Sequence, residues 1–481
     1  MNQKLSVLEK VGYSLGDLSA NLVFQTLMTY LAYFYTDVYG LAPEVATPVI
    51  FTVGMVAAFA FNPIIGALAD RTRTRWGKFR PWVLFTAIPL SLAALMAFTT
   101  PDFDEKGKVI YAIVTYAVLL FLYAANNLPY AALSGVITGD MGERNSLSSY
   151  RFVAVMVAQF SVQALMYPMI EYLGNGNKAA GFSQVMIYLA IIGAVLMLIT
   201  FFTTRERIVP TREQSSSLGQ DLKDLSRNRP WLIMLVSTIL VFITLAMKGG
   251  TYLYYFENYV SKDALSSFLG TFGVHNSENP AATGFSIFNG LGIIFMITGI
   301  TFSKRFADKY GKRDTFKTSL FLSTLPVLLF YVFPPESVWL IFLAQVIHGL
   351  FYGISTPLLW AMIADVADYS EWKNNRRATA IIFSAMMVGL KAGLTLGQTF
   401  ITGLLDFFHY VPNAVQSDET VQGIKLTVSI FAAIPFLLAT GLLFFYEIDK
   451  KMEVRIENDL KLRRTGVARD NPAAPDAPTH Q

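Results

Sequence analysis

The segment Asp70–Trp82 reads DRTRTRWGKFRPW. Its five basic residues are Arg71, Arg73, Arg75, Lys78 and Arg80. Apolar runs flank the segment at about 45–69 and 81–100. Each run is close to the roughly 20 residues that a helix needs to cross a bilayer. A short loop this basic between two such helices is typical of the cytoplasmic side of a membrane. The segment therefore predicts a helical hairpin that orients the rest of the chain.

The composition agrees with a membrane protein. Of the 481 residues, 53% are hydrophobic and only 15% are charged, whereas soluble proteins are nearer one quarter charged. The absence of cysteine excludes disulfides, zinc–thiolate sites and cysteine nucleophiles. The four histidines have no metal-ligand spacing, so we expect no metal, no cofactor and no enzyme activity. The first apolar segment is too long for a cleavable signal peptide.

Apolar runs between charged or turn-rich loops predict an all-α protein with twelve transmembrane helices. The expected spans are 12–36, 45–69, 81–100, 109–135, 145–171, 183–203, 231–257, 284–303, 316–333, 338–362, 379–405 and 424–446. The loops on one side contain 22 Lys or Arg residues, and the opposite loops contain four. Because Lys and Arg concentrate in cytoplasmic loops, both termini are expected in the cytoplasm of a cell with an inner membrane.

The longest of the basic loops divides the chain near its middle. The sequence AD…GK at 69–78 recurs with shorter spacing at 307–312, which suggests two related halves. We expect a six-helix half at 1–203, a cytoplasmic loop at 204–230, a second six-helix half at 231–448 and a partly disordered tail at 449–481. Two parallel six-helix halves match the major facilitator architecture, in which substrate binds between the halves near the membrane midplane.

Several motifs resemble those of one known family. They are GYSLGD (12–17), FYTDVYGL (34–41), DRTRTRWGKFRPW (70–82), NLPYAAL (127–133), GDMGERNSLSSYR (139–151) and ADVADYSEWK (364–373). The chain resembles the glycoside–pentoside–hexuronide:cation symporters over about residues 5–450, and its start is similar to the glucuronide carriers. The resemblance implies uptake of a sugar or sugar acid, driven by sodium, lithium or protons.

Four ionisable residues lie deep in predicted spans: Asp17, Arg151, Lys248 and Lys391. Such residues are costly in a membrane and indicate function. The resemblance implies that Asp17 contacts sugar and that Arg151 and Lys391 line the same cavity. Alternatively, Asp17 pairs with Arg151 or Lys391 to hold the two halves together. Lys248 is expected nearer the outer end of its helix, where it binds substrate or extends to the interface.

The fourth predicted span has a polar face. Tyr123, Asn126, Asn127 and Tyr130 follow i, i+3, i+4, i+7 spacing. An aromatic ring suits the apolar face of a sugar and an amide suits its hydroxyls, so we expect these residues to bind substrate; helix packing is the alternative. Asn21 and Phe24 are expected on the face of Asp17, and Thr395 and Gln398 on the face of Lys391.

The second predicted span departs from the family. Where the family has two acids for its cation, this chain has Ala58 and Asn62, followed by Pro63. Asn127 also stands where the family usually has an aspartate, which leaves Asp17 as the deep carboxylate. We therefore expect coupling to a proton rather than sodium, through Asp17. We also expect an acidic sugar, whose carboxylate would pair with Arg151 or Lys391. The alternative is a neutral sugar beside an uncharged Lys391.

Charged residues cluster at the predicted cytoplasmic helix ends. They are Asp70, Arg71, Arg75, Lys78, Asp140, Arg144, Asp365, Asp368 and Glu371. The resemblance implies that they close an inner gate. The simpler interpretation is that they only fix the topology and bind lipid headgroups. Acids among the cations favour the gate, because acids contribute little to topology.

Three other functions compete with sugar import. A lysophospholipid carrier would need a wide apolar cavity, and a membrane enzyme would need a nucleophile or metal cluster. A sensor would bind substrate without moving it. The chain lacks the Gly-rich nucleotide-binding motif, so direct drive by ATP is not expected. The expected partners are a sugar or sugar acid, a coupling cation and membrane lipid. We expect no nucleic-acid partner, and we expect the protein to be a monomer.

Overall fold

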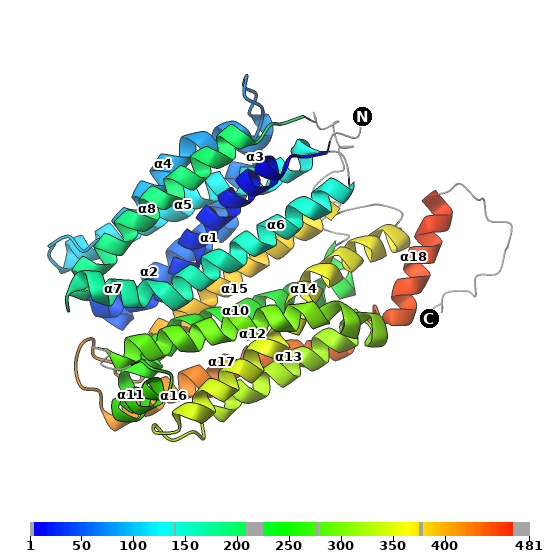
Figure 1. The fold of residues 1–481 in the computed structure, drawn as a ribbon. Helices are drawn as coiled ribbons and strands as arrows, with labels where there is room; N and C mark the ends of the chain where they lie inside the picture. The colour runs from blue at the N-terminus through cyan, green and yellow to red at the C-terminus, as the bar shows by residue number, and fades with distance from the viewer. Residues whose placement is uncertain (1–3, 139–140, 208–224, 275–278, 375–378, 465–481) are drawn as a thin grey trace.

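The computed structural model describes residues 4–138, 141–207, 225–274, 279–374 and 379–464. These residues are almost entirely helical, and within them the only strand-like pairing is a bridge between Thr74 and Gly77 (Figure 1). The predicted all-α class is therefore confirmed for the described part of the chain.

The helices fall into two groups that lie side by side (Figure 1). The N-terminal group contains α1 (Val7–Tyr33), α2 (Pro43–Val56), α3 (Asn62–Arg71), α4 (Arg80–Ala97), α5 (Glu105–Ile137), α6 (Met141–Phe160), α7 (Met166–Gly174) and α8 (Lys178–Thr203). The C-terminal group contains α10 (Arg229–Asn258), α11 (Lys262–Thr271), α12 (Pro280–Tyr310), α13 (Lys312–Leu329), α14 (Val338–Asn374), α15 (Thr379–Phe407), α16 (Asp418–Leu426) and α17 (Ala432–Leu442), and α18 (Lys450–Arg464) follows.

Single π-helical turns interrupt several long helices. Ala57–Phe61 joins α2 to α3, Ser161–Leu165 joins α6 to α7, and Thr427–Phe431 joins α16 to α17. A proline follows each turn within a few residues. Proline lacks an amide hydrogen and therefore disturbs the regular hydrogen bonding of the preceding turn.

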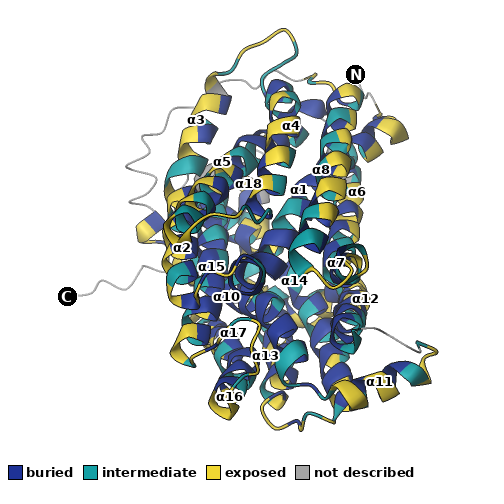
Figure 2. Ribbon diagram, turned by 90° about the vertical axis from the view of Figure 1, so that its left-hand side faces the viewer, coloured by how far each residue is buried: buried dark blue, intermediate teal, exposed yellow. Residues whose placement is uncertain are grey.

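Nine helices of the described residues are long and apolar enough to cross a membrane. Large apolar side chains on their outer faces are exposed, for example Phe59, Phe85 and Val153 at more than 60%. Figure 2 shows that buried residues fill the interior and exposed residues cover the outer faces. Lipid is an apolar solvent, so these outward faces suit a bilayer.

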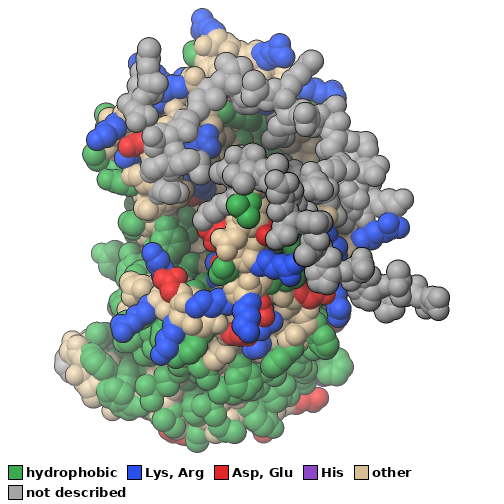
Figure 3. All heavy atoms as spheres, turned by 90° about the vertical axis from the view of Figure 1, so that its right-hand side faces the viewer, with side chains coloured by type: hydrophobic (Ala, Val, Ile, Leu, Met, Phe, Trp, Pro, Cys, Tyr) green, Lys and Arg blue, Asp and Glu red, His purple; other side chains and the backbone are tan. Residues whose placement is uncertain are grey.

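The two groups meet along a few helices. In the N-terminal group α1, α2, α6 and α7 form the contact, and in the C-terminal group α10, α12 and α15 form it. The start of α1 and the helix α18 lie at the same end of the molecule (Figure 1). We call this the terminal end and the opposite one the distal end. Figure 3 faces the terminal end and shows many Lys and Arg side chains with acids among them.

The loop in Asp70–Trp82 lies between α3 and α4 and is held by one carboxylate. Glu206 accepts hydrogen bonds from the backbone amides of Lys78, Phe79 and Arg80 at 2.7–2.8 Å. It thereby satisfies free amides at the start of α4. Gly77 has φ +112°, and a Cβ there would lie 2.4 Å from the Glu206 carboxyl carbon. The basic loop thus depends on a glycine and a distant acid.

We predict that Glu206→Ala loosens this loop. The variant loses three charge-assisted hydrogen bonds, each worth about 1.5–3 kcal/mol. Trypsin should then cleave within residues 71–80 at least several-fold faster in detergent-solubilised protein. Asp102→Ala, which changes an exposed acid elsewhere, is the matched control. Equal cleavage rates in the two variants would contradict the capping role.

Candidate functional site

A charged cluster joins α1 to α6. Arg151 Nε donates to Asp17 Oδ2 at 2.8 Å, and Asn21 Nδ2 donates to Asp17 Oδ1 at 3.3 Å. The Asp17 side chain is 8% exposed and that of Arg151 is 29% exposed. The structure thus brings together three of the predicted binding residues and pairs the deep acid with one deep cation.

Two tyrosines support this cluster. The rings of Tyr13 and Tyr130 stack with their centroids 4.7 Å apart, and each hydroxyl donates to the backbone carbonyl of the other residue. The guanidinium of Arg151 lies 5.6 Å from each ring centroid, where the cation is attracted to the π faces. Tyr130 therefore fixes α5 against α1 and orients Arg151.

The predicted polar face of α5 is split between several neighbours. Tyr123 faces a cavity between the two groups. Asn126 is fully buried and donates to Thr86 of α4 at 2.7 Å. Asn127 is half-buried and is not among the described residues that line that cavity. Tyr130 is fully buried against Tyr13. Helical spacing placed the four on one side of α5, but a face this wide contacts α1, α4 and the cavity at once.

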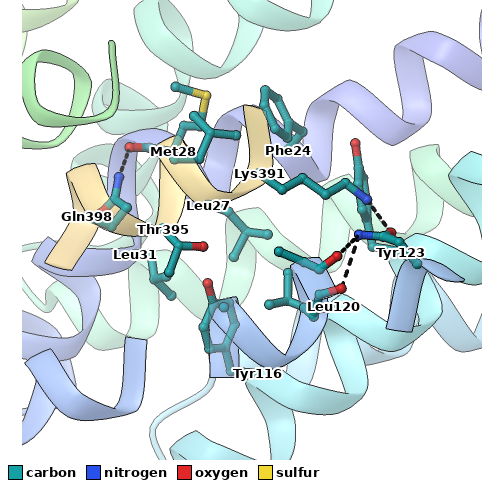
Figure 4. Close-up of a pocket in the computed structure, with 15 residues that line it drawn as sticks. Phe24, Leu27, Met28, Leu31, Tyr116, Leu120, Tyr123, Lys391, Thr395 and Gln398 are labelled. Atoms are coloured by element: carbon teal, nitrogen blue, oxygen red, sulfur yellow. Dashed lines mark hydrogen bonds between the residues drawn. The ribbon is translucent and has the colours of Figure 1, made fainter. Parts of the chain in front are cut away.

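The cavity that Tyr123 faces, the α15 cavity, has a volume of about 80 Å³. It is lined by Phe24, Leu27, Met28, Leu31, Gly54, Ala57, Ala58, Asn62, Tyr116, Leu120, Tyr123, Lys391, Leu394, Thr395 and Gln398. Figure 4 shows Lys391 extending across it from α15 toward Tyr123. Its ammonium donates to Asn62 Oδ1 and lies 5.9 Å from the Tyr123 ring centroid. Apart from Lys391 and a few amides and hydroxyls, this cavity is apolar.

A second and larger cavity, the α14 cavity, has a volume of about 220 Å³. Its lining residues are Phe24, Gln25, Met28, Met156, Gln159, Gln163, Phe242, Leu245, Lys248, Gly249, Tyr252, Asn289, Gly292, Ile293, Met296, Gln345, His348, Gly349, Tyr352 and Thr356. Phe24 and Met28 line both cavities, so α1 lies between them. Both groups of helices contribute to each cavity.

Sequence analysis missed most of the polar residues of the α14 cavity. Gln25 lies in α1, Gln159 in α6, Asn289 in α12, and Gln345 and His348 in α14. A usable signal exists in the sequence, because Gln345, His348, Tyr352 and Thr356 recur at helical spacing within an apolar span. Uncharged polar residues are common in helix contacts, and this made the pattern easy to overlook.

Lys248 points into the α14 cavity. It is 5% exposed, and its ammonium is hydrogen-bonded to His348 Nε2. His348 Nδ1 in turn contacts the Ser323 carbonyl oxygen at 2.7 Å. The alternative that Lys248 extends to the membrane interface is therefore wrong, since its polar end is held in the interior.

Polar contacts join the two groups at the distal end. Glu257 of α10 accepts hydrogen bonds from Tyr33, Tyr167 and Lys178 at 2.5–2.9 Å. Asp37 accepts from the Tyr410 hydroxyl at 2.6 Å. We call these six residues the distal network. The sequence analysis did not single it out, although Asp37 lies in the motif FYTDVYGL.

At the terminal end, the described ion pairs of Arg207, Lys10 and Lys312 each lie within one group of helices. In the N-terminal group Arg207 binds Glu9 at 2.6 Å and Lys10 binds Glu143 at 2.9 Å. The Glu9 hydrogen bond raises the pKa of Arg207 above its ordinary value. In the C-terminal group Lys312 binds Asp365 at 2.7 Å.

Lys312 also binds Glu453 of α18 at 2.8 Å. Burial disfavours its charged form, but the two carboxylates outweigh burial and raise the pKa of Lys312. Asp368 and Glu371 follow Asp365 on α14.

The other predicted gate residues have different surroundings. Arg144 donates to the carbonyls of Thr138 and Gly135 at 2.9 and 3.1 Å and so caps the end of α5. The guanidinium of Arg75 lies 4.6 Å from the Trp76 ring centroid. Arg71 ends α3, and the Lys78 amide binds Glu206. Asp140 and the side chain of Asp70 lie outside the described residues.

No group of three or more His, Asp or Glu side chains in the described ranges is arranged to hold a metal ion. The cavities contain amides, hydroxyls, aromatic rings and cations. Such groups can bind the hydroxyls and acidic groups of a small polar molecule.

The chain matches the family model described as "MFS/sugar transport protein" over residues 12–276 and 279–450. It is 33% identical to the putative glycoside/cation symporter YagG of Escherichia coli, over 99% of both chains. It is 30% identical to a glucuronide carrier protein homolog of Escherichia coli, over 96% of this chain and 98% of the relative. The isoprimeverose transporter of Lactiplantibacillus pentosus is 29% identical, over 97% and 93% of the two chains.

Solved structures support the fold. The nucleoside transporter NupG superposes with a TM-score of 0.59 and 18% identity, over 92% of this chain and 100% of that chain. A bacterial homologue of the human peptide transporters PepT1 and PepT2 superposes with a TM-score of 0.65 and 14% identity, over 95% and 100%. The family model and the relatives show that this chain is a membrane transporter, not an enzyme, and that it belongs to the sugar-transport family of the major facilitator superfamily.

Proposed function

We propose that this protein is a cation-coupled symporter that imports a sugar, a glycoside or a hexuronide by alternating access. The observation that carries the proposal is the pair of cation-bearing cavities between two groups of helices, one mostly apolar and one with a polar lining. Names of the relatives support it, since they include a glycoside/cation symporter, a glucuronide carrier homolog and an isoprimeverose transporter.

The proposed topology has twelve spans in two six-helix halves, at 1–203 and 231–448, with a central loop and a C-terminal tail. The helices α1, α13 and α15 would complete the nine apolar spans, since each has at least 18 residues and lies among them. The charge asymmetry supports a cytoplasmic terminal end in a bacterial-type inner membrane. The protein would work as a monomer in contact with lipid.

In this topology the structure corresponds to an inward-facing state. The distal network would be the closed outer gate, because Glu257 and Asp37 bind partners across the two groups. The charges at the terminal end would exchange partners when the inner gate closes. The predicted gate residues are well positioned for this, as Asp365 already pairs with Lys312 at the end of α14. Alternating access needs such contacts to form in one state and break in the other.

The proposed substrate site includes Asp17, Asn21, Tyr123, Arg151 and Lys391. Asp17, Asn21, Phe24 and Met28 follow one face of α1, and this face leads from the charged cluster to both cavities. Asn126, Asn127 and Tyr130 would contribute through the position of α5. Polar lining in the α14 cavity favours a sugar over a lysophospholipid.

The second span supports coupling to a proton rather than sodium. Ala58 offers no side-chain oxygen, and Asn62 Oδ1 already accepts from the Lys391 ammonium. A fixed cation thus lies beside the position where the family has the acids of its cation site. Repulsion from it would oppose a sodium ion. Asp17 would be the proton-carrying carboxylate.

We predict that Arg151→Gln and Asp17→Asn each weaken sugar binding. Each variant removes charge-assisted contacts from a desolvated site, which costs on the order of 2 kcal/mol, or about 30-fold in affinity. Binding is measured by calorimetry on purified protein, with Arg305→Gln, an exposed cation, as control. If the pair only held α1 to α6, the double variant would carry no unpaired charge and would recover the parental affinity.

The proposed function is tested by uptake into proteoliposomes. A radiolabelled aryl glucuronide or aryl glucoside should accumulate when an inward proton gradient is imposed, and a sodium gradient at constant pH should add nothing. Clear stimulation by sodium would contradict the coupling proposal. Uptake of neither sugar under any gradient, by protein that is correctly inserted, would contradict the transport proposal.

A further inference from the structure

Lys248 is a buried cation whose described hydrogen-bonding partner is a neutral group. The Ser323 carbonyl oxygen can only accept, so His348 Nδ1 carries the hydrogen and donates to it. Nε2 is then the acceptor for the Lys248 ammonium. His348 therefore orients Lys248 without neutralising its charge, and it occupies one of the three donors of the ammonium.

The described surroundings of Lys248 contain no compensating acid. Among the described residues that line the α14 cavity there is no Asp or Glu. Asp17, the deep carboxylate that the sequence singles out, binds Arg151 at 2.8 Å. An unpaired ammonium away from water is penalised heavily, so an anion in the cavity would be bound strongly.

The cavity around Lys248 also offers partners for hydroxyl groups. Gln163 and Gln345 present amides, and Tyr352 presents a hydroxyl. The α15 cavity around Lys391 differs, because it is smaller, mostly apolar, and its ammonium already binds Asn62. A polyhydroxylated anion therefore fits the α14 cavity better.

We propose that Lys248, oriented by His348, binds the carboxylate of an acidic sugar in the α14 cavity. This inference rests on the proposed function and names its substrate class and acid-binding residue. Gln163, Gln345 and Tyr352 would receive the sugar hydroxyls. His348 is a positioning residue, since its contact with the substrate passes through Lys248.

The experiment compares an aryl β-glucuronide with the aryl β-glucoside of the same aglycone. The two differ only in a carboxylate in place of a hydroxymethyl group. Their affinities are measured on the same purified sample. The ratio of the affinity for the glucuronide to that for the glucoside is then independent of how much protein is folded. The parent protein should prefer the glucuronide.

Lys248→Gln should lower this ratio at least tenfold, whereas the control Lys304→Gln, which changes an exposed lysine of α12, should leave it within about threefold. Lys391→Gln tests the cation of the other cavity as the acid-binding residue. His348→Gln keeps an acceptor for Lys248 and should retain most of the ratio, whereas His348→Leu should lose it. A purely structural role would weaken both ligands equally and leave the ratio unchanged.

Three results would overturn the inference. They are an unchanged ratio in Lys248→Gln, loss of the ratio in Lys391→Gln alone, and a parent protein that binds and transports only the glucoside. The last result would leave the proposed sugar transporter intact. If the parent neither binds nor transports either compound, the proposed function fails and the acid site fails with it.

Discussion

Burying charge inside a membrane protein is costly, and the way this chain compensates each buried charge determines its organisation. Asp17 is paired with Arg151 across α1 and α6. Glu257 is paired with Lys178 and two tyrosine hydroxyls at the distal end. Lys248 and Lys391 differ, because their described hydrogen-bonding partners are a histidine and an amide. The paired charges connect helices, whereas these two cations lie in the cavities between the groups.

This distribution links the charges to movement. The contacts of Glu257 and Asp37 join the N-terminal and C-terminal groups at one end only. At the other end the ion pairs of Glu9 and Asp365 stay within their own groups. A transporter of this architecture needs one end to be closed while the other is open. The distal network closes one end with a small set of hydrogen bonds to Glu257 and Asp37.

Much of the fold could be predicted from the sequence, because long apolar runs and basic loops report directly on the membrane. The charged residues Asp17 and Arg151 were also found, since an ion in an apolar span is conspicuous. Spacing placed four polar residues on one side of α5, but it does not reveal that Asn126 turns to Thr86 and Tyr130 to Tyr13. Gln345 and His348 share a helical face in the sequence, but their role depends on tertiary contacts with α10 and α13 that this spacing does not reveal.

The central claim is that the distal network seals the cavities from one side and that the cytoplasmic side is open. A single cysteine at Gly249 tests it, because the chain has no other cysteine and a Cβ there would meet only the Met28 carbonyl, at 3.7 Å. An impermeant thiol reagent should label Gly249→Cys from the cytoplasmic side, in inside-out vesicles. It should label the same protein poorly from outside, in intact cells.

Adding Glu257→Gln removes the anionic acceptor of the distal network and should raise labelling from outside several-fold. Glu336→Gln, an exposed acid in the loop between α13 and α14, should not change it. Ready labelling of the parent protein from outside, or no effect of Glu257→Gln, would contradict the account.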